Sequence, residues 1–298
     1  MRVFVTGGSG FIGSAVIPEL LGAGHRVLAL ARSDRSAGTL RAAGADVHRG
    51  SLDDPGDLAR AAAGTDGVIH LAFNHDHFPD LTRAAEGDLR VIEAIGAALA
   101  GSDRPFVITS GTLMLASVDG VATEEDTPVP GTYRADPDLA ALALAERGVR
   151  SAVVRLPPSV HGHGDQGFLP RLIDVAREKG VSAYVGDGTN RWPAVHRLDA
   201  ARLFRLALES APAGTGLHGA ADEGIPFKDI AAAIGSGLGV PLKGIPAEEA
   251  QAHFGWLGMA AAVDNATSSE RTRNILGWKP EQPGLIADLE VGHYFGAP

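Results

Sequence analysis

Three glycines spaced three positions apart, Gly7, Gly10 and Gly13, stand between an apolar run at residues 2–5 and an amphipathic segment at residues 11–21. This arrangement predicts a strand, a tight turn and a helix that together bind a dinucleotide. The first glycine makes the turn, the second lets the backbone approach a pyrophosphate, and the third lets helix and strand pack closely. The pyrophosphate then lies against unpaired N–H groups at the helix N-terminus. A glycine turn with only a structural role is the alternative.

Two H-x-H pairs could donate or accept protons. Each pair follows an apolar run that predicts a strand, and ligands of open α/β sheets bind where the strands end. An imidazole changes its charge near neutral pH, so these side chains are candidates for proton transfer in a substrate cleft. Imidazoles also bind zinc, but two pairs on separate loops are weak support for a metal site, and we predict none. The residues of these loops that we place in the substrate cleft are Asn74, His75, His77, His161 and His163.

The second predicted strand ends in Ala31-Arg32-Ser33, at the position where an acidic residue would bind the hydroxyls of an adenosine ribose. An arginine there suits a 2′-phosphate instead. Arg32 and Ser33 could bind that phosphate through charge-assisted hydrogen bonds, with Arg35 as a helper. We therefore expect NADP (NADPH) as the cofactor. The alternative is that Arg32 is a solvated surface residue.

The segment that ends the third predicted strand contains Ser51, Leu52 and Asp53. We expect the adenine ring to lie here, with Leu52 packed on the ring and Asp53 accepting a hydrogen bond from the adenine amino group. The alternative is that Asp53 caps the helix that begins near Pro55. The sequence leaves both interpretations open.

Strand and helix patterns alternate through the first half of the chain. Apolar runs of strand length recur with helical periodicity between them, which is the pattern of a parallel sheet covered on both faces. We therefore predict an α/β fold: a Rossmann-type doubly wound parallel sheet with a smaller, mostly helical C-terminal substrate lobe. The predicted strands include residues 3–5, 27–31, 68–72, 106–108 and 152–156, and the predicted helices include residues 37–43, 55–63 and 81–100.

The strict alternation ends after Leu156, where two prolines open a loop rich in glycine and histidine. We predict a dinucleotide-binding domain at residues 1–156, to which residues 191–218 return. The substrate lobe is then formed by residues 157–190 and 219–298.

The composition favours a small-molecule partner. The 298 residues include 26 Lys and Arg against 36 Asp and Glu, and the formal net charge of −10 opposes binding to nucleic acid or to anionic membranes. The absence of cysteine excludes disulfides, thiolate nucleophiles and cysteine zinc sites. No apolar run approaches the ~20 residues of a membrane span, and no signal peptide precedes the first strand. We therefore expect a cytoplasmic protein.

The motifs that follow the predicted strands resemble those of the extended or atypical short-chain dehydrogenase/reductases. That superfamily includes NAD(P)-dependent epimerases, dehydratases and 3β-hydroxysteroid dehydrogenase-like reductases. The resemblance covers nearly the whole chain, and the motifs have the expected order and spacing at residues 6–13, 68–72, 108–112, 154–162 and 195–201. It implies hydride transfer between NADP and the carbonyl or alcohol of a small molecule. An epimerase or dehydratase that recycles its cofactor, and a nucleotide-binding regulator without catalysis, are the alternatives.

In that superfamily a serine or threonine after the fifth strand hydrogen-bonds the substrate oxygen. A tyrosine is the general acid, and a lysine four residues later lowers the pKa of the tyrosine and holds the nicotinamide ribose. The resemblance gives the first role to Ser110, with Thr112 as a substitute, and the second to Tyr133. Position 137 is proline, so the lysine is missing. Either another cation such as Arg134 adjusts Tyr133, or Tyr133 is not the acid and a histidine takes its place.

The resemblance also implies the walls of the binding site. Arg191 and His196 should face the cleft, because an arginine near this position contacts phosphate in related sugar-nucleotide enzymes. Trp192 beside them suggests an apolar or aromatic ligand, with a position in the core as the alternative. The further residues that we expect to contact the dinucleotide are Ser9, Phe11, Ile12, Leu71, Ala72, Phe73, Pro157, Pro158 and Val160.

Two predicted helices, at residues 81–100 and 139–147, resemble the pair through which relatives dimerise. The resemblance therefore implies a homodimer. We expect a small-molecule substrate as the other partner, and neither nucleic acid nor a membrane.

Overall fold

The computed structural model describes residues 1–74, 81–115, 120–131 and 134–296 of the chain. Within these residues the largest sheet has seven strands, all parallel, in the order β10-β6-β5-β4-β1-β2-β3. The strands are β1 Arg2–Thr6, β2 Arg26–Ala31, β3 Asp46–Arg49, β4 Gly67–His70, β5 Pro105–Gly111, β6 Arg150–Leu156 and β10 Thr215–His218. The strand order reverses between β1 and β4, which is the doubly wound topology. The predicted fold class is confirmed.

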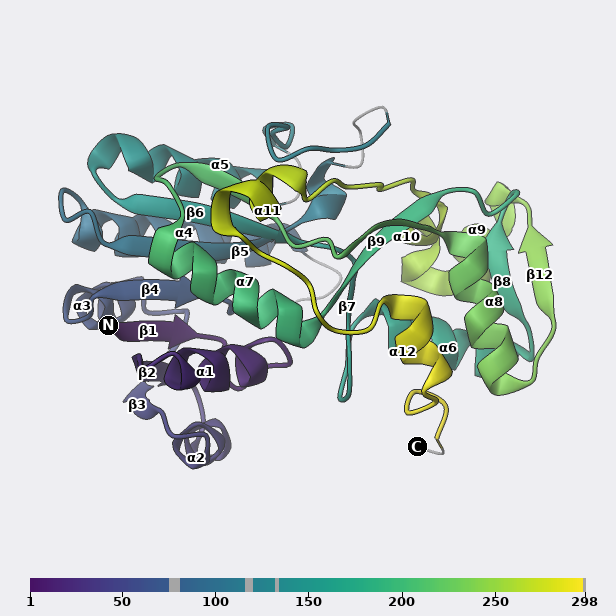
Figure 1. Cartoon of the computed structure of the whole chain (residues 1–298), viewed down its shortest axis with the longest axis horizontal. Helices are drawn as coiled ribbons and strands as arrows, with labels where there is room; N and C mark the ends of the chain where they lie inside the picture. Colours follow the sequence, from purple (N-terminus) through teal and green to yellow (C-terminus); the bar gives the residue numbers. More distant parts are fainter. Residues whose placement is uncertain (75–80, 116–119, 132–133, 297–298) are drawn as a thin grey trace.

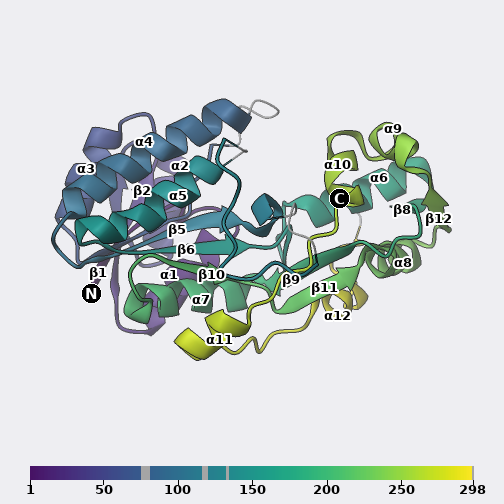
Figure 2. The same ribbon diagram turned by 90° about the horizontal axis from the view of Figure 1, so that it is seen from above.

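Helices cover both faces of this sheet, so this part of the molecule has three layers (Figure 2). One face carries α3, α4 and α5, and the other carries α1, α7 and α11. Val3 and Val5 pack on the α1 side, whereas Phe4 packs on the α4 side. Because both faces are buried, the strands are nearly continuous apolar runs. The helices are α1 Gly13–Gly22, α2 Asp34–Ala42, α3 Pro55–Ala63, α4 Leu81–Leu99, α5 Ala135–Ala143, α7 Arg197–Ser210 and α11 Glu270–Leu276.

Side-chain caps set where two of these helices begin. The Ser33 hydroxyl accepts a hydrogen bond from the backbone of the third helical residue, so α2 begins three residues before the predicted start at residue 37. The Asp54 carboxylate caps α3, and Pro55 takes the first helical position. Each such cap stabilises the helix by ~1 kcal/mol. The alternative that Asp53 caps α3 is therefore wrong, because Asp54 caps this helix.

A second group of elements lies beyond the carboxyl ends of the main strands (Figure 1). It contains a three-stranded sheet in the order β11-β9-β7 and a two-stranded sheet of β12 and β8. Trp192, Phe227 and Phe254 lie in its own apolar core. The strands are β7 Ser159–His161, β8 Ser182–Val185, β9 Arg191–His196, β11 Asp222–Pro226 and β12 Leu242–Ile245. The helices are α6 Phe168–Lys179, α8 Phe227–Leu238, α9 Ala250–Phe254, α10 Gly258–Ala262 and α12 Leu285–Glu290.

Two segments return from the second group to the main sheet. The first consists of α7 and β10, which pack on and extend the sheet. β9 pairs with β7 and β11 and not with a strand of the main sheet. The segment that returns to the main sheet therefore begins at Arg197 and not at residue 191 as predicted. The second consists of α11 and Trp278, which pack on the α7 side of the main sheet although the sequence placed them in the substrate lobe.

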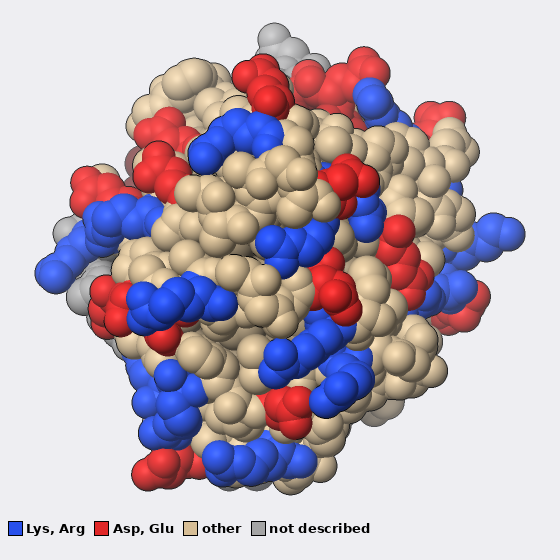
Figure 3. All heavy atoms as spheres, turned by 90° about the vertical axis from the view of Figure 1, so that its left-hand side faces the viewer, with Lys and Arg blue, Asp and Glu red and all other residues tan. Residues whose placement is uncertain are grey.

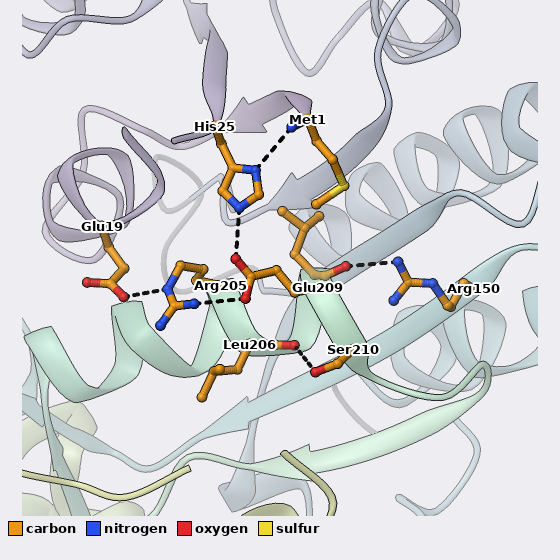
Figure 4. A network of polar contacts seen from close by, with 9 residues as sticks. Met1, Glu19, His25, Arg150, Arg205, Leu206, Glu209 and Ser210 are labelled. Carbon is orange, nitrogen blue, oxygen red and sulfur yellow. Dashed lines mark hydrogen bonds and ion pairs between the residues drawn. The ribbon is translucent and has the colours of Figure 1, made fainter. Parts of the chain in front are cut away.

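Polar contacts fix α7 against α1 near the amino ends of the strands (Figure 4). Arg205 Nε donates to Glu19 in α1 at 2.7 Å, and Arg205 Nη1 donates to Glu209 at 2.8 Å. His25, which precedes β2, lies 2.9 Å from Glu209 Oε1. These bonds orient the returning helix on the sheet.

The surface at the amino ends of the main strands carries mixed charge (Figure 3). Lys and Arg side chains are interspersed with Asp and Glu side chains over this face. At the amino ends of the strands, Arg26 of β2 forms an ion pair with Asp46 of β3. Over the described ranges, no helix combines the length and the apolar character that crossing a membrane requires.

Candidate active site

The loop after β1 has the shape that a dinucleotide pyrophosphate requires. Gly7 has a φ of 71°, a left-handed conformation that favours glycine, and a Cβ there would lie 2.7 Å from the backbone nitrogen of Ala72. A Cβ at Gly13 would collide with the backbone of Gly7 and Gly8. A Cβ at Gly10 would meet only the Gly7 carbonyl oxygen, at 3.2 Å. The backbone is therefore open where a phosphate would approach the start of α1, and the residues present fit the group.

A chain of buried hydrogen bonds begins at Thr6, the last residue of β1. The Thr6 hydroxyl accepts from the backbone N–H of Ala72 at 3.2 Å and lies 2.7 Å from Nδ1 of His70. The other ring nitrogen of His70 lies 2.9 Å from Oδ1 of Asp88 in α4. The three side chains belong to residues that are at most 4% exposed. This chain ties the glycine loop to β4 and α4.

Arg134, the residue before α5, adds two further hydrogen bonds to this row. Its Nη2 donates to Oδ2 of Asp88 at 3.2 Å and to the carbonyl oxygen of Thr109 in β5 at 2.7 Å. The guanidinium carbon lies 4.2 Å from the centre of the Phe73 ring. Arg134 therefore joins α4, β5 and the segment after β4 at one point.

The ionisation of Asp88 determines which atoms donate and which accept along this row of hydrogen bonds. Burial raises the pKa of Asp88, but the hydrogen bond from His70 and the charge of Arg134 outweigh burial, so the pKa lies below its usual value. An ionised Asp88 requires His70 Nε2 to carry a proton and donate it. The other ring nitrogen, Nδ1, can then accept from the Thr6 hydroxyl, whose oxygen accepts from Ala72. In this arrangement the Ala72 N–H, the Thr6 hydroxyl and His70 Nε2 each have an acceptor.

Ser110 lies near the carboxyl end of β5, on the same face of the sheet as Thr6 and His70. Strand alternation places it there, because Ile108, two residues earlier, packs in the apolar core between the sheet and α4. Its hydroxyl oxygen is buried and has no hydrogen-bond partner in the part of the chain that the structure describes. Leaving such a group without a partner costs about 1–3 kcal/mol. The hydroxyl is therefore well suited to a ligand oxygen.

Thr112 does not serve as a substitute for Ser110, which corrects the sequence prediction. The Thr112 hydroxyl donates to the side-chain oxygen of Asn265 at 2.8 Å, and the Asn265 amide donates back to the Thr112 carbonyl at 2.9 Å. Both residues are at most 2% exposed. The pair joins the end of β5 to a segment 153 residues later. The pair holds these two segments together. The Thr112 hydroxyl already donates to Asn265 and is therefore not available to a substrate oxygen.

Arg32 and Ser33 lie on the surface between β2 and α2. The Ser33 hydroxyl accepts from the helix backbone, so the two residues stand at a helix N-terminus, where an anion is favoured. Asp34, the acidic residue nearest to them, forms an ion pair of 3.1 Å with Arg49. This local environment is compatible with a phosphate.

The residues that we expect around adenine lie at the surface after β3. The Ser51 hydroxyl donates to the Asp53 carboxylate at 2.9 Å, and the Asp53 backbone N–H donates to the Ser51 hydroxyl at 3.2 Å. Leu52 packs partly against the apolar core on the α4 side. The exposed Asp53 carboxylate keeps one oxygen for a further donor.

The connection from β6 to β7, which we expect to contact the nicotinamide, lies beside the main sheet. Pro157 is buried, Pro158 is half-buried, and Val160 packs partly on the core of the α7 side.

The remaining residues that we predict to contact the dinucleotide come from the loops after β1 and β4, and all but one of them are half-buried. The half-buried residues are Phe11, Ile12, Leu71, Ala72 and Phe73, and the exposed residue is Ser9.

His161 is not presented to a ligand, which corrects its predicted place in the substrate cleft. Its ring is fully buried, and Nδ1 lies 2.8 Å from a carboxylate oxygen of Asp288 in α12. Burial lowers the pKa of His161 despite this carboxylate, so the imidazole is neutral. His163 is exposed and stacks on His293, with 5.9 Å between the ring centres. Both histidines thus face the C-terminal segment.

Trp192 lies in the core of the second group, as the alternative interpretation held. It is fully buried against Phe168 and Phe227, and its Nε1 donates to a backbone carbonyl in α10 at 3.0 Å. The predicted contact with a ligand is therefore wrong. Arg191 beside it donates twice to Asp264, at 2.6 Å and 3.0 Å.

His196 at the end of β9 caps α7, because its Nδ1 accepts from the backbone N–H of Leu198 at 3.3 Å. Its ring lies edge-on to His161, with 5.3 Å between the ring centres. The next residue, Arg197, lies with its guanidinium carbon 5.4 Å from the centre of the Phe11 ring in the glycine loop. β9 therefore ends beside the predicted pyrophosphate site.

Tyr133, His75 and His77 lie outside the described residues, and Asn74 is half-buried at the end of its segment. The described ranges hold no cluster of three or more His, Asp or Glu side chains able to bind a metal ion.

A family model with the description "NAD dependent epimerase/dehydratase family" matches residues 3–217. The chain belongs to this family. The match covers β1 to β10, and hence the glycine loop, the Thr6 chain and Ser110.

Relatives of this epimerase/dehydratase chain include one that matches nearly all of it and others that match a large part of it. "Uncharacterized protein C2A9.02" from Schizosaccharomyces pombe is 50% identical over 99% of this chain and 100% of its own length. "Sterol-4-alpha-carboxylate 3-dehydrogenase, decarboxylating" from Dictyostelium discoideum is 31% identical over 70% of this chain and 67% of its own length. The family match, this dehydrogenase and other relatives named as reductases identify an NAD(P)-dependent enzyme of the oxidoreductase type.

The fold is also that of a solved "dTDP-glucose 4,6-dehydratase" from Streptomyces venezuelae "with NAD and TYD bound". That structure has a TM-score of 0.77 and 22% sequence identity, with 99% of this chain and 96% of that chain covered. The similarity confirms the doubly wound sheet with a helical C-terminal region.

Sequence reasoning missed Asp88, Asn265 and Asp288 as partners of site residues. The role of Asp88 could have been predicted, because Asp88 lies on the same helix face as Ala84 and Val91, which are buried. A carboxylate within the apolar stripe of a helix indicates a buried polar partner. Asn265 and Asp288 contact residues more than 120 positions earlier, and their sequence surroundings gave no comparable sign.

Proposed function

We propose that this chain is an NADP-dependent oxidoreductase that transfers a hydride to or from the carbonyl or alcohol of a small molecule. The observation that carries the proposal is the buried Ser110 hydroxyl without a partner among the described residues, at the same sheet edge as the glycine loop. The dinucleotide would supply or accept the hydride. The protein's task is then to hold the substrate oxygen and to move one proton.

The proposed cofactor contacts follow the geometry of the edge. Gly7, Gly10 and Gly13 would admit the pyrophosphate, and Arg32 with Ser33 would bind a 2′-phosphate at the start of α2. The exposed arginine in place of an acidic residue supports NADP over NAD.

Ser110 would donate a hydrogen bond to the substrate oxygen, and Tyr133 remains the proposed proton donor on sequence grounds. Residues 1–156, joined by α7 and β10, would bind the dinucleotide, and the second group of elements would bind the substrate. The Arg191 guanidinium, paired with Asp264, is poorly placed to take a substrate phosphate as well. We therefore favour a substrate without a nucleoside diphosphate.

We also propose a homodimer formed through α4 and α5, as the superfamily resemblance implies. Sedimentation should give a mass near twice 30.7 kDa. A monomer at micromolar concentration would contradict this part of the proposal.

The test of function has two stages. Calorimetric titration should show tighter binding of NADPH than of NADH, and equal or tighter binding of NADH would overturn the cofactor assignment. A panel of ketones, aldehydes and sugar nucleotides should then reveal stoichiometric consumption of NADPH. Product formation without net consumption would instead favour epimerase or dehydratase chemistry.

Replacing the proposed oxygen-binding hydroxyl tests the site itself. Ser110→Ala should reduce kcat/KM about 10²-fold with little change in the affinity for NADPH. Ser210→Ala is the matched control, because Ser210 donates only to a carbonyl within α7 at the amino ends of the strands. Full activity of Ser110→Ala would remove Ser110 from the site.

A further inference from the structure

The lysine that the superfamily places four residues after its tyrosine is absent here. Pro137 stands at that position, buried in the first turn of α5. Proline has no side-chain donor, so another group must hold the nicotinamide half of the cofactor. Arg134 lies one turn earlier, at the residue before α5.

The backbone of Arg134 is held in an unusual conformation. Its φ of 60° and ψ of 5° are left-handed, and Asp103 is the other described residue besides glycine with a positive φ. Such a conformation is unfavourable for a residue with a side chain and persists where the surroundings impose it. The ion pair with Asp88, the bond to the Thr109 carbonyl and the ring of Phe73 are those surroundings.

Both hydrogen bonds that orient the Arg134 guanidinium are made by the same nitrogen. A single nitrogen, Nη2, makes both the bond to Asp88 and the bond to Thr109. Nε is buried and has no hydrogen-bond partner within the described ranges. A guanidinium has five N–H donors, so this one keeps capacity for a further acceptor. The guanidinium lies between Phe73, a predicted cofactor contact, and β5, the strand that carries Ser110.

Asp88 in turn is oriented by residues of the cofactor edge. His70 donates to it, and His70 is fixed by Thr6, whose oxygen also binds the backbone of Ala72. Ala72 packs directly on Gly7, the first glycine of the loop. The position of the Arg134 side chain thus depends on a continuous row of hydrogen bonds that starts at the pyrophosphate loop.

We propose that Arg134 takes the place of the missing lysine by donating a hydrogen bond to the nicotinamide ribose of the cofactor. Asp88, His70 and Thr6 are positioning residues that hold its guanidinium toward that ribose. The inference rests on the proposed function, since it requires that the chain bind a nicotinamide dinucleotide.

The test compares two ligands that differ in the nicotinamide half. NADPH contains it, whereas adenosine 2′,5′-bisphosphate carries only the adenine half. Arg134→Met should weaken NADPH binding about tenfold in calorimetry and leave the bisphosphate affinity unchanged. Arg134→Lys should recover part of the NADPH affinity, because a lysine keeps a donor and the charge. Circular dichroism should show that each variant is folded.

The positioning role is tested by a double-mutant cycle. Asp88→Asn should weaken NADPH binding about threefold, and adding it to Arg134→Met should cause no further loss, because Asp88 acts through Arg134. Additive losses would overturn the positioning role. Arg271→Met is the control, since Arg271 forms a surface ion pair with Glu125 at 2.6 Å.

The outcomes separate the two proposals. If the wild-type chain binds neither NADPH nor NADH, the proposed function fails. If the wild-type chain binds NADPH and Arg134→Met binds it equally well, only the role of Arg134 fails. If Arg134→Met weakens both ligands to the same extent, Arg134 supports the fold and the inference is again wrong. Should Arg134→Met not fold, Arg134→Lys and Asp88→Asn provide the same comparison.

Discussion

Two arginine–aspartate pairs lie near the α4 and α5 face of the main sheet, and they differ in how completely they are satisfied. Arg155 of β6 and Asp138 of α5 form two parallel hydrogen bonds of 2.9 Å, and both side chains are at most 1% exposed. Arg134 and Asp88 share one bond of 3.2 Å, and the Arg134 side chain is 15% exposed. Arg155 uses both edges of its guanidinium, whereas Arg134 Nε has no partner among the residues that the structure describes.

The location of the two pairs explains this difference. Arg155 and Asp138 come from a strand and a helix, which fix both backbones, and Arg155 also donates to the carbonyl of Asp126 at 2.8 Å. Arg134 precedes a helix in a left-handed conformation, at the edge where ligands of doubly wound folds bind. A buried ion pair can therefore serve either stability or binding, and the number of unused donors distinguishes the two.

The largest predicted effect concerns stability. Arg155→Met should lower the free energy of unfolding by about 3–5 kcal/mol, because it leaves the Asp138 carboxylate buried without its cation. Arg134→Met should lower it by only about 1–2 kcal/mol, because Asp88 keeps the hydrogen bond from His70. Urea denaturation followed by circular dichroism measures both values. Equal losses would break the comparison between the pairs.

A third carboxylate, Asp165, sharpens the comparison because the groups that donate hydrogen bonds to it are neutral. It accepts from the backbone N–H of Gly167 at 2.6 Å and from the Tyr294 hydroxyl at 3.1 Å. Burial raises the pKa of Asp165 to about 6, whereas the pair with Arg134 helps to hold the pKa of Asp88 below its usual value. The two carboxylates therefore act on stability with opposite signs.

The sign for Asp165 follows from proton binding. Between pH 4 and pH 6 the folded chain holds a proton at Asp165 that the unfolded chain has lost, so the free energy of unfolding falls as the pH rises. Asp165→Asn should remove this contribution, about 1–3 kcal/mol between pH 4.5 and pH 7.5. Urea denaturation of both proteins at the two pH values measures the difference. Identical pH dependence would show that Asp165 titrates normally.

The smallest predicted effect lies at the opposite end of the strands, in the network of Figure 4. Arg205→Met removes the ion pairs with Glu19 and Glu209, whose side chains are 32% and 31% exposed. Exposed pairs contribute about 0–1 kcal/mol, and salt weakens them. We expect a loss below about 1 kcal/mol that shrinks in 0.5 M sodium chloride. A loss of several kcal/mol would mean that this edge is as critical as the core pairs.

The sequence predicted the main sheet well because its signals are local. The glycine spacing, the apolar strands and the helical periodicity each arise within about 15 residues, and both faces of the sheet are buried. The boundary of the second group was predicted less well. β9 is as apolar as a strand of the main sheet, and only its pairing with β7 and β11 shows where it belongs.

The location of a candidate site residue was predicted where it follows from a strand end alone. Ser110 and the glycines, which lie at the expected edge of the sheet, are of this kind. Thr112, His161 and Trp192 were misplaced because their partners are distant in sequence or because their type fits both a core and a ligand contact. An aspartate such as Asp288 looks like an ordinary helix residue until the fold brings a histidine to it.

The late return of α7 to the main sheet has a consequence for synthesis on the ribosome. The apolar side chains of β5 and β6 that α7 covers, such as Val107 and Val154, are translated about 90 and about 45 residues before that helix. At about 5–20 residues per second these intervals last about 2–18 seconds. During them the nascent chain exposes a partly uncovered apolar surface, so this is the stage at which chaperones protect it most usefully against aggregation.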